Sequence, residues 1–118
     1  MLNDATGFKH AYVATGKTDL RKGQDSLLMI IKNEFNLDPF EGGNIFLFCG
    51  TRGHVIKAIV FEGDGFTLLT KRLINGHFQW PRNRREVLDI SEEQYRDLMN
   101  GFAIEYKSTI EKIRPLYV

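Results

Sequence analysis

One stretch of the chain, residues 44–81, constrains the fold more than any other, because apolar runs of β-forming residues alternate in it with glycine-bearing turns. The runs cover residues 45–49, 55–62, 66–72 and, more briefly, 77–80. Gly63-Asp64-Gly65, between the second and third runs, is typical of a hairpin, since Gly and Asp tolerate the positive φ of tight turns. Pro81 then ends the pattern, because proline has no N–H to donate to a neighbouring strand. The stretch predicts an antiparallel meander of three strands with a short fourth.

Residues 20–36 carry an apolar stripe at helical spacing, which predicts a long N-terminal helix against one face of the sheet. Thr18 and Asp19 precede this segment and suit the cap of a helix. Gly23 costs a helix about 1 kcal/mol relative to alanine, so either another backbone approaches it or the helix begins after it. The stripe is formed by Leu20, Leu27, Leu28, Ile31 and Phe35.

The two ends of the chain add a short strand and a short helix. Residues 8–14 predict a strand at an edge of the central sheet, and residues 109–114 predict a helical turn. Ser91 and Gln94 have the spacing of a capping box, which predicts a C-terminal helix ending near Asn100. Because both sheet faces are apolar, the C-terminal segment or a partner chain is expected to cover the face that the first helix leaves open. The expected fold class is α+β, with a central antiparallel meander sheet of three to five strands, a long N-terminal helix on one face and a short C-terminal helix.

Length and composition indicate one domain, residues 1–118, because domains most often contain roughly 100–150 residues. Cys49 is the single cysteine, which excludes an internal disulfide and a zinc site with several cysteines; it is expected to be buried. No apolar run approaches the roughly 20 residues of a membrane span, and the N-terminus lacks the pattern of a signal peptide. A cytoplasmic protein with no membrane partner is therefore expected.

Positive charge is concentrated in one part of the sequence, although the net charge is only +1. Residues 66–85 contain five basic side chains and no acid, whereas the other 11 basic residues are accompanied by all 15 acids. The five are Lys71, Arg72, Arg82, Arg84 and Arg85. Cations of this kind bind phosphates without sequence preference, and an exposed Phe78 or Trp80 could stack on a base. The alternatives are a solvated face balanced by acids from elsewhere in the fold, and two aromatic residues in the core.

No motif in the sequence favours catalysis. His10, His54 and His77 lack the spacing of metal ligands, and neither a nucleophile motif nor a phosphate-binding glycine loop is present. Glu62 and Asp64 would have to be joined by further acids to hold the ions of a metal-dependent nuclease, and Asp64 is better explained as a turn former. The chain is expected to be no enzyme and to need no cofactor.

Several short pieces of the sequence match one known family in order and spacing. They are T-D-L-R-K-G-Q-D-S-L (18–27), L-D-P-F (37–40), I-F-L-F (45–48), G-D-G-F (63–66), K-R-L (71–73) and G-H-F-Q-W-P (76–81). The chain thus resembles the accessory protein TnpB, encoded by the second open reading frame of the insertion-sequence-66 group of bacterial mobile elements. The resemblance implies a non-catalytic role in transposition beside a separate transposase, which carries the acids for strand transfer.

The resemblance also implies a functional surface. Five cations match family positions: Arg21, Lys22, Lys57, Lys71 and Arg72. Together with Arg82, Arg84, Arg85 and Trp80 they are the candidate contacts for nucleic acid or a partner. The alternative for Arg21 and Lys22, without a role in binding, is a surface ion pair with Asp19 or Asp25. The chain departs from the family at Phe61-Glu62, where tryptophan and aspartate are usual, and in the turn of residues 50–54, which is usually more basic.

The expected partners are DNA at the ends of the element, the transposase of the same element and a second copy of this chain. Two other functions stay open. One is a protein-binding or oligomerising module without affinity for nucleic acid, which would use the apolar second face of the sheet. The other, less favoured, is a metal-dependent nuclease that depends on Glu62 and Asp64.

Overall fold

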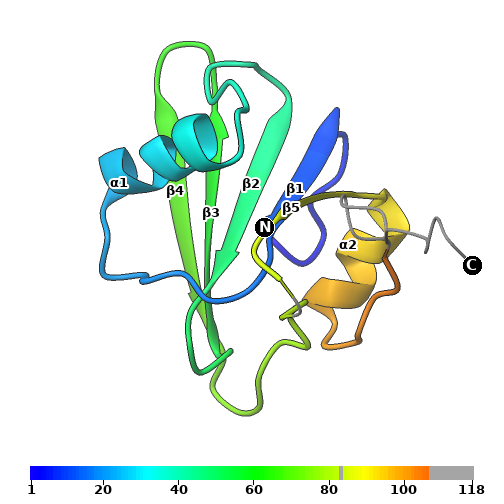
Figure 1. Ribbon diagram of the computed structural model, residues 1–118. Coiled ribbons are helices and arrows are strands. Elements are labelled where there is room, and N and C mark those ends of the chain that lie inside the picture. The colour runs from blue at the N-terminus through cyan, green and yellow to red at the C-terminus, as the bar shows by residue number, and fades with distance from the viewer. Residues whose placement is uncertain (83, 107–118) are drawn as a thin grey trace, which may run out of the picture.

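The computed structural model describes residues 1–82 and 84–106, and its centre is a five-stranded sheet with the order β4-β3-β2-β1-β5 (Figure 1). The strands are β1 (His10–Ala14), β2 (Asn44–Cys49), β3 (Val55–Phe61), β4 (Phe66–Arg72) and β5 (Val87–Ile90). Strands β2, β3 and β4 form the expected antiparallel meander, and β1 pairs with β2. These four strands were predicted and are present, but β1 is not at an edge of the sheet, because β5 lies beyond it.

The expectation of a wholly antiparallel sheet is wrong, because β1 and β2 are parallel and the sheet is mixed. The connection between them contains a helix, which lets the chain cross over and re-enter the sheet in the same direction. The predicted strand at residues 77–80 is also wrong, since this segment is a loop. Its aromatic side chains, Phe78 and Trp80, turn into the core, and β5 takes the outer place beside β1.

The first helix is short, so the expectation of a long N-terminal helix is wrong. It comprises α1 (Gln24–Met29), which continues as one π-helical turn, η1 (Ile30–Glu34). The residues before Gly23 form a loop that packs beside the end of β2, where the Thr18 N–H donates to the Cys49 carbonyl at 3.0 Å. Gly23 is extended and occupies the N-cap position, so the helix begins after it, which was one of the two alternatives for this glycine.

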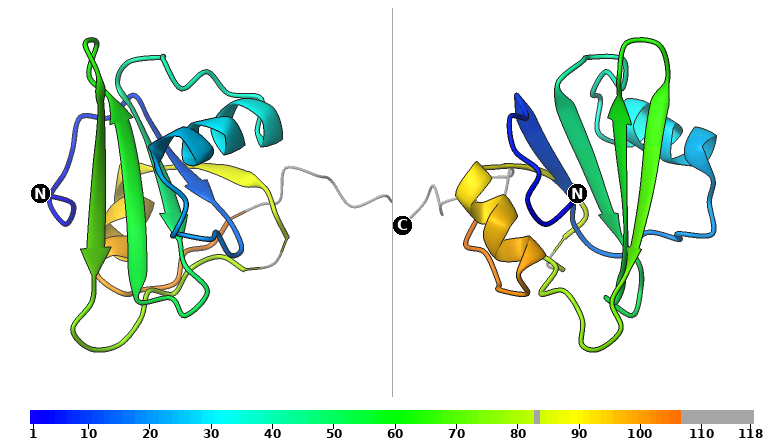
Figure 2. Two further views of the ribbon diagram at one scale, coloured as in Figure 1. Left: turned by 90° about the vertical axis from the view of Figure 1, so that its left-hand side faces the viewer. Right: turned by 180° about the vertical axis from the view of Figure 1, so that it is seen from behind.

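Two apolar layers enclose the sheet, one on each face (Figure 2). On one face, α1 and η1 bury Leu27 and Ile31 against Phe46, Phe48 and Ile59. The other face is covered by α2 (Glu92–Met99) together with the loop that carries the buried aromatic residues. The C-terminal segment, not a partner chain, thus covers the second face. Neither helix of the described residues has the length and apolarity to cross a membrane.

The predicted capping box at the start of α2 is confirmed. The Gln94 N–H donates to the Ser91 hydroxyl at 3.1 Å, and the Ser91 N–H donates to the Gln94 side-chain oxygen at 2.8 Å. These bonds satisfy two N–H groups and fix the start of the helix. The helical turn expected at residues 109–114 lies outside the described residues.

Tyr95 on α2 ties the N-terminal segment to the core and gives the fold an expected alkaline limit. Its hydroxyl donates to the Leu2 carbonyl at 2.6 Å, and burial raises its pKa to about 12. Because the folded chain favours the protonated phenol, this contribution is complete below pH 10 and is lost as the pH rises towards 12. Chemical unfolding at a series of pH values should show a smaller alkaline loss of stability in Tyr95→Phe, which should cost about 1 kcal/mol at neutral pH. An identical alkaline loss in both proteins would contradict this role.

Candidate nucleic-acid interface

A basic groove lies at the end of the sheet where β2 ends and β3 begins. This end of the sheet is in the lower part of Figure 1. Its volume is about 910 Å³, and four parts of the chain line it: the loop before α1, the β2–β3 turn, β3 and β4. Four of the lining residues are cations and one is an acid, Asp19. The cations are Arg21, Arg52, Lys57 and Arg72.

Strand alternation explains why cations from β3 and β4 meet on this side of the sheet. Lys57 is paired with Thr70, and Arg72 is paired with Val55, so their side chains project from the face that α1 only partly covers. The Lys57 ammonium also lies 3.4 Å from the Lys22 carbonyl, to which it donates, and this contact holds the ammonium beside the loop. Thr70 and Arg72 are exposed to solvent.

The single acid of the groove is already paired. Arg21 donates from two of its nitrogens to the two carboxylate oxygens of Asp19, at 3.0 and 3.1 Å. These hydrogen bonds lower the pKa of Asp19 to about 2, so it stays ionised at neutral pH. The ion pair with Asp19, which was the alternative to a binding role for Arg21, is therefore present. Arg52, Lys57 and Arg72 have no carboxylate partner among the described residues.

His54 supports Arg72 from the β2–β3 turn. The Arg72 guanidinium and the His54 Nε2 atom are 3.0 Å apart, and the guanidinium is always the donor. In this contact the Nε2 atom of His54 accepts the hydrogen bond. The contact joins the Arg72 side chain to the β2–β3 turn and does not neutralise its charge.

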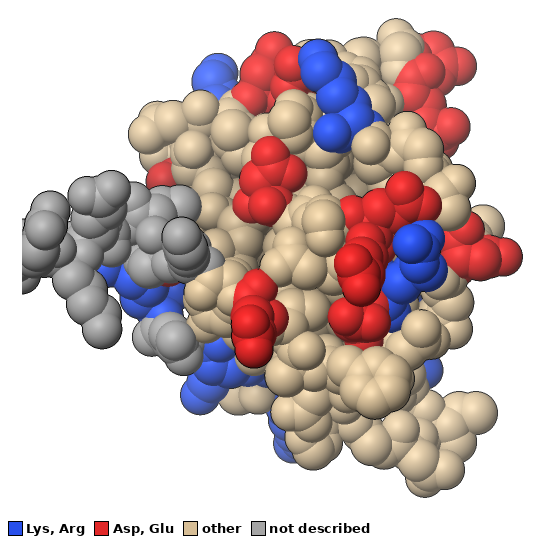
Figure 3. Space-filling model, turned by 90° about the vertical axis from the view of Figure 1, so that its right-hand side faces the viewer, with Lys and Arg blue, Asp and Glu red and all other residues tan. Residues whose placement is uncertain are grey.

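The side of the molecule remote from β4 carries the opposite charge. Figure 3 shows this side, and acidic side chains predominate on it. Asp89, Glu92 and Glu93, on β5 and the first turn of α2, are exposed. The small net charge is thus the sum of a basic groove at one end of the sheet and an acidic side next to β5.

The structure distributes the predicted contact residues among different places. Arg21, Lys57 and Arg72 are together in the basic groove, and Lys22 contributes its carbonyl beside it. Lys71 is on the other face of β4, where its ammonium donates to the Asn3 side chain. Neighbouring cations in the sequence are thus separated by the sheet.

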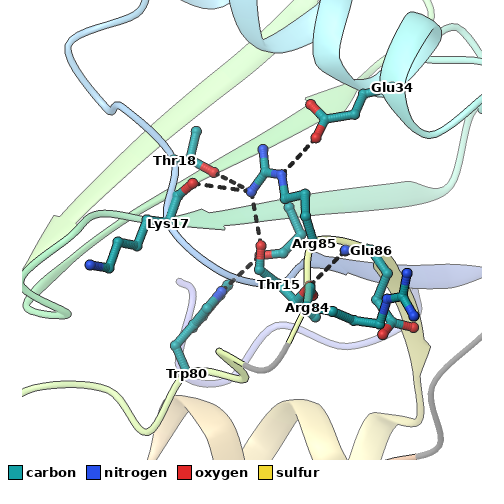
Figure 4. A network of polar contacts seen from close by, with 9 residues as sticks. Thr15, Lys17, Thr18, Glu34, Trp80, Arg84, Arg85 and Glu86 are labelled. Carbon is teal, nitrogen blue, oxygen red and sulfur yellow. Dashed lines mark hydrogen bonds and ion pairs between the residues drawn. The ribbon is translucent and has the colours of Figure 1, made fainter.

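Arg82 and Arg85 bind backbone carbonyl groups within the protein. Arg82 donates to the Gly16 carbonyl at 2.7 Å and to the Gly50 carbonyl at 2.8 Å, and so joins the loop after β1 to the turn after β2. Arg85 donates to the Thr15 carbonyl at 2.9 Å and pairs with Glu34 at 2.8 Å (Figure 4). Arg82 thus holds Gly50, and Arg85 also donates to the hydroxyl of Thr18; both of these contacted residues line the groove.

Trp80 and Arg84 lie outside the groove as well. The Trp80 side chain is 5% exposed, and its indole N–H donates to the Ala14 carbonyl at 2.8 Å, so its ring faces the core. Arg84 is exposed on the segment before β5.

Arg52 and His54 were not among the contact residues predicted from the sequence. Both belong to the turn of residues 50–54, which attracted notice only for being less basic than is usual in the family. Gly50 and Gly53, on either side of Thr51-Arg52, were the available signal, because they predict a turn that presents these two side chains to solvent. Among the described residues, no three or more His, Cys, Asp or Glu side chains are grouped to hold a metal ion.

The fold and the groove together define a small α+β protein with a cationic groove at one end of its sheet. A family model described as "IS66 Orf2 like protein" matches residues 9–109, and the chain belongs to this family. The resemblance inferred from the short sequence pieces is thereby confirmed. Membership associates the chain with insertion-sequence transposition in an accessory role.

Two relatives come from Sinorhizobium fredii (strain NBRC 101917 / NGR234). The chain is 37% identical to "Uncharacterized protein y4hO" over 107 residues, which are 91% of this chain and 90% of that protein. It is 33% identical to "Uncharacterized protein y4jC" over 89 residues, which are 75% of each chain. No solved structure matches the chain.

Proposed function

We propose that this protein is a non-catalytic accessory factor of insertion-sequence transposition that binds the phosphate backbone of DNA in its basic groove. The observation that carries the proposal is the convergence of Arg21, Arg52, Lys57 and Arg72, from four parts of the chain, around a single acid. Family membership supports the connection with transposition, a reaction whose substrate is DNA.

The chemistry of the groove suits phosphates better than base edges. Guanidinium groups match the oxygens of a phosphate in a fork geometry, and the Lys57 ammonium adds a point charge. Thr51 and Thr70 add hydroxyl groups that can donate to phosphate oxygens. The groove lining contains no aromatic side chain other than the His54 ring, so base stacking contributes little.

Binding of labelled duplex DNA across a salt series tests the proposal. The wild-type protein should bind, and the logarithm of its affinity should fall linearly with the logarithm of salt concentration, because phosphate contacts release counterions. Arg72→Ala or Lys57→Ala should each weaken binding by about tenfold, since a charge-assisted contact contributes on the order of 1.5 kcal/mol. Each should also reduce the salt slope by about 0.9.

Lys71→Ala is the matched control, because Lys71 is the neighbour of Arg72 on β4 but projects from the other face. It should leave the affinity and the salt slope close to those of the wild type. Equal losses in Lys71→Ala and Arg72→Ala would refute binding in the groove. Absence of binding near physiological salt would refute direct DNA contact and favour the transposase as the partner. Comparing element ends with a scrambled duplex measures sequence preference, which phosphate contacts alone do not provide.

A further inference from the structure

Strand β4 forms an open edge of the sheet. It is the outermost strand in the order, and among the described residues no other strand lies beyond it (Figure 2). It runs for seven residues without a proline, and its pairing with β3 is continuous from Phe66 to Arg72. At the opposite edge, β5 has four residues and leads at once into α2. A long regular edge is a surface to which another strand can bind.

The register with β3 shows which backbone groups of β4 point away from the sheet. Opposed residues of an antiparallel pair alternate between bonded and non-bonded pairs. The bonds at the two ends of the hairpin set this alternation: Leu73 N–H donates to the His54 carbonyl, and Glu62 N–H donates to the Gly65 carbonyl, both at 2.8 Å. The N–H and C=O groups that point outward therefore belong to residues 66, 68, 70 and 72.

We propose that this edge binds the β4 edge of a second copy of the chain, antiparallel, with Leu69 opposite Leu69 across a twofold axis. In this register, residue 68 of each copy opposes residue 70 of the other, and residue 66 opposes residue 72. All of these residues have outward N–H and C=O groups, so every outward group of β4 gains a partner. The sheets of the two copies become one continuous sheet.

The side chains of β4 fit the same register. Its two cations, Lys71 and Arg72, lie at one end of the strand, so antiparallel pairing places them at opposite ends of the interface. Lys71 then opposes Thr67 of the second copy, and Arg72 opposes Phe66. Parallel pairing in register would place Lys71 beside Lys71 of the second copy and Arg72 beside Arg72, and such pairs of like charges are unfavourable. These features make the second copy a better partner for the edge than an unrelated strand.

The dimer also has a consequence for DNA binding that rests on the proposed function. Thr70 and Arg72 belong both to the open edge and to the lining of the basic groove. Joining two β4 strands therefore brings two grooves to one face of the continuous sheet, related by the twofold axis. A dimer of this kind contacts the phosphates of two neighbouring segments of one duplex, whose backbone has its own twofold symmetry.

A cysteine at the twofold axis tests the pairing directly. Opposed residues of a non-bonded pair have Cα atoms about 4.5 Å apart, which lies within the range for a disulfide. Leu69→Cys should therefore form a covalent dimer under mild oxidation, seen on non-reducing gels. Thr67→Cys is the matched control, because the two copies of residue 67 are four positions out of register, about 13 Å apart, and should not join. Cys49 is buried, so it does not compete.

Sedimentation of the unmodified protein without DNA gives the second measurement. The mass should approach twice the 13.6 kDa of the chain as concentration rises. Thr70→Pro removes an outward N–H without removing a bond to β3, and should weaken dimerisation by about tenfold or more, because two symmetry-related bonds are lost. A monomer at all concentrations, or equal cross-linking of both cysteine variants, would overturn the proposal. Neither result depends on whether the groove binds DNA.

Discussion

Trp80→Ala is expected to lower the free energy of unfolding by about 3–5 kcal/mol, the range found when a large buried aromatic side chain is removed. The Trp80 side chain is 5% exposed and packs edge-on against Phe78, with the ring centres 6.4 Å apart. Its removal opens a cavity between the sheet and α2. It also leaves the Ala14 carbonyl without its indole donor. Since domains of this size are stable by about 5–15 kcal/mol, a substantial fraction of that stability should be lost.

Urea unfolding followed by circular dichroism measures this loss. Gln79→Ala is the matched control, because Gln79 is the neighbour of Trp80 and its side chain is exposed. It should change the stability by no more than about 0.5 kcal/mol. Trp80→Phe fills most of the cavity but donates no hydrogen bond, and should lie between alanine and the wild type. If Trp80→Ala and Gln79→Ala unfold at the same urea concentration, Trp80 has no role in the core.

Trp80 also shows why sequence could offer alternatives for this site but not choose between them. An aromatic residue beside arginines is compatible with base stacking and with core packing. The choice depends on what lies across from it, namely the end of β1 at Ala14, which is 66 residues away. No local pattern contains that information.

The cations illustrate the same difficulty. The cluster of five between residues 66 and 85 is continuous in sequence, but the fold gives its members separate places. Arg72 enters the groove, Lys71 projects from the other face, and Arg82 and Arg85 bind carbonyl groups. Because neighbouring residues of a strand point to opposite faces of a sheet, the prediction of β4 was enough to place Lys71 and Arg72 on different faces. The roles of Arg82 and Arg85 depend on contacts with residues far away in the sequence.

The predictable parts of the fold are those with local causes. The β2–β3–β4 meander follows from turn glycines and β-forming runs, and the start of α2 follows from a capping box. The parallel pairing of β1 with β2 and the position of β5 are non-local and were missed. The first helix was predicted too long because its apolar stripe includes Leu20. In the structure Leu20 belongs to a loop and packs against Gly50. A Cβ atom at position 50 would lie only 3.2 Å from the Cδ1 atom of Leu20.

Arg82→Met is expected to lower the free energy of unfolding by about 3 kcal/mol, because each of the two carbonyl groups that Arg82 joins loses a charged donor. Gly16 and Gly50 belong to the two segments that frame the basic groove, so their separation should also disturb the groove. DNA affinity should fall together with stability, although Arg82 itself does not line the groove.

Arg84→Met is the matched control. Arg84 is two residues after Arg82 and exposed, so this substitution removes an equal charge without removing the contacts of Arg82. It should leave stability unchanged and reduce DNA affinity only slightly. Arg82→Lys separates charge from geometry, because an ammonium group keeps the charge but lacks the planar fork that reaches both carbonyls. If Arg82 contacts phosphate, Arg82→Lys should bind DNA almost as well as the wild type and unfold at the same urea concentration. If Arg82 positions the walls of the groove, as the structure indicates, Arg82→Lys should lose stability and affinity nearly as Arg82→Met does.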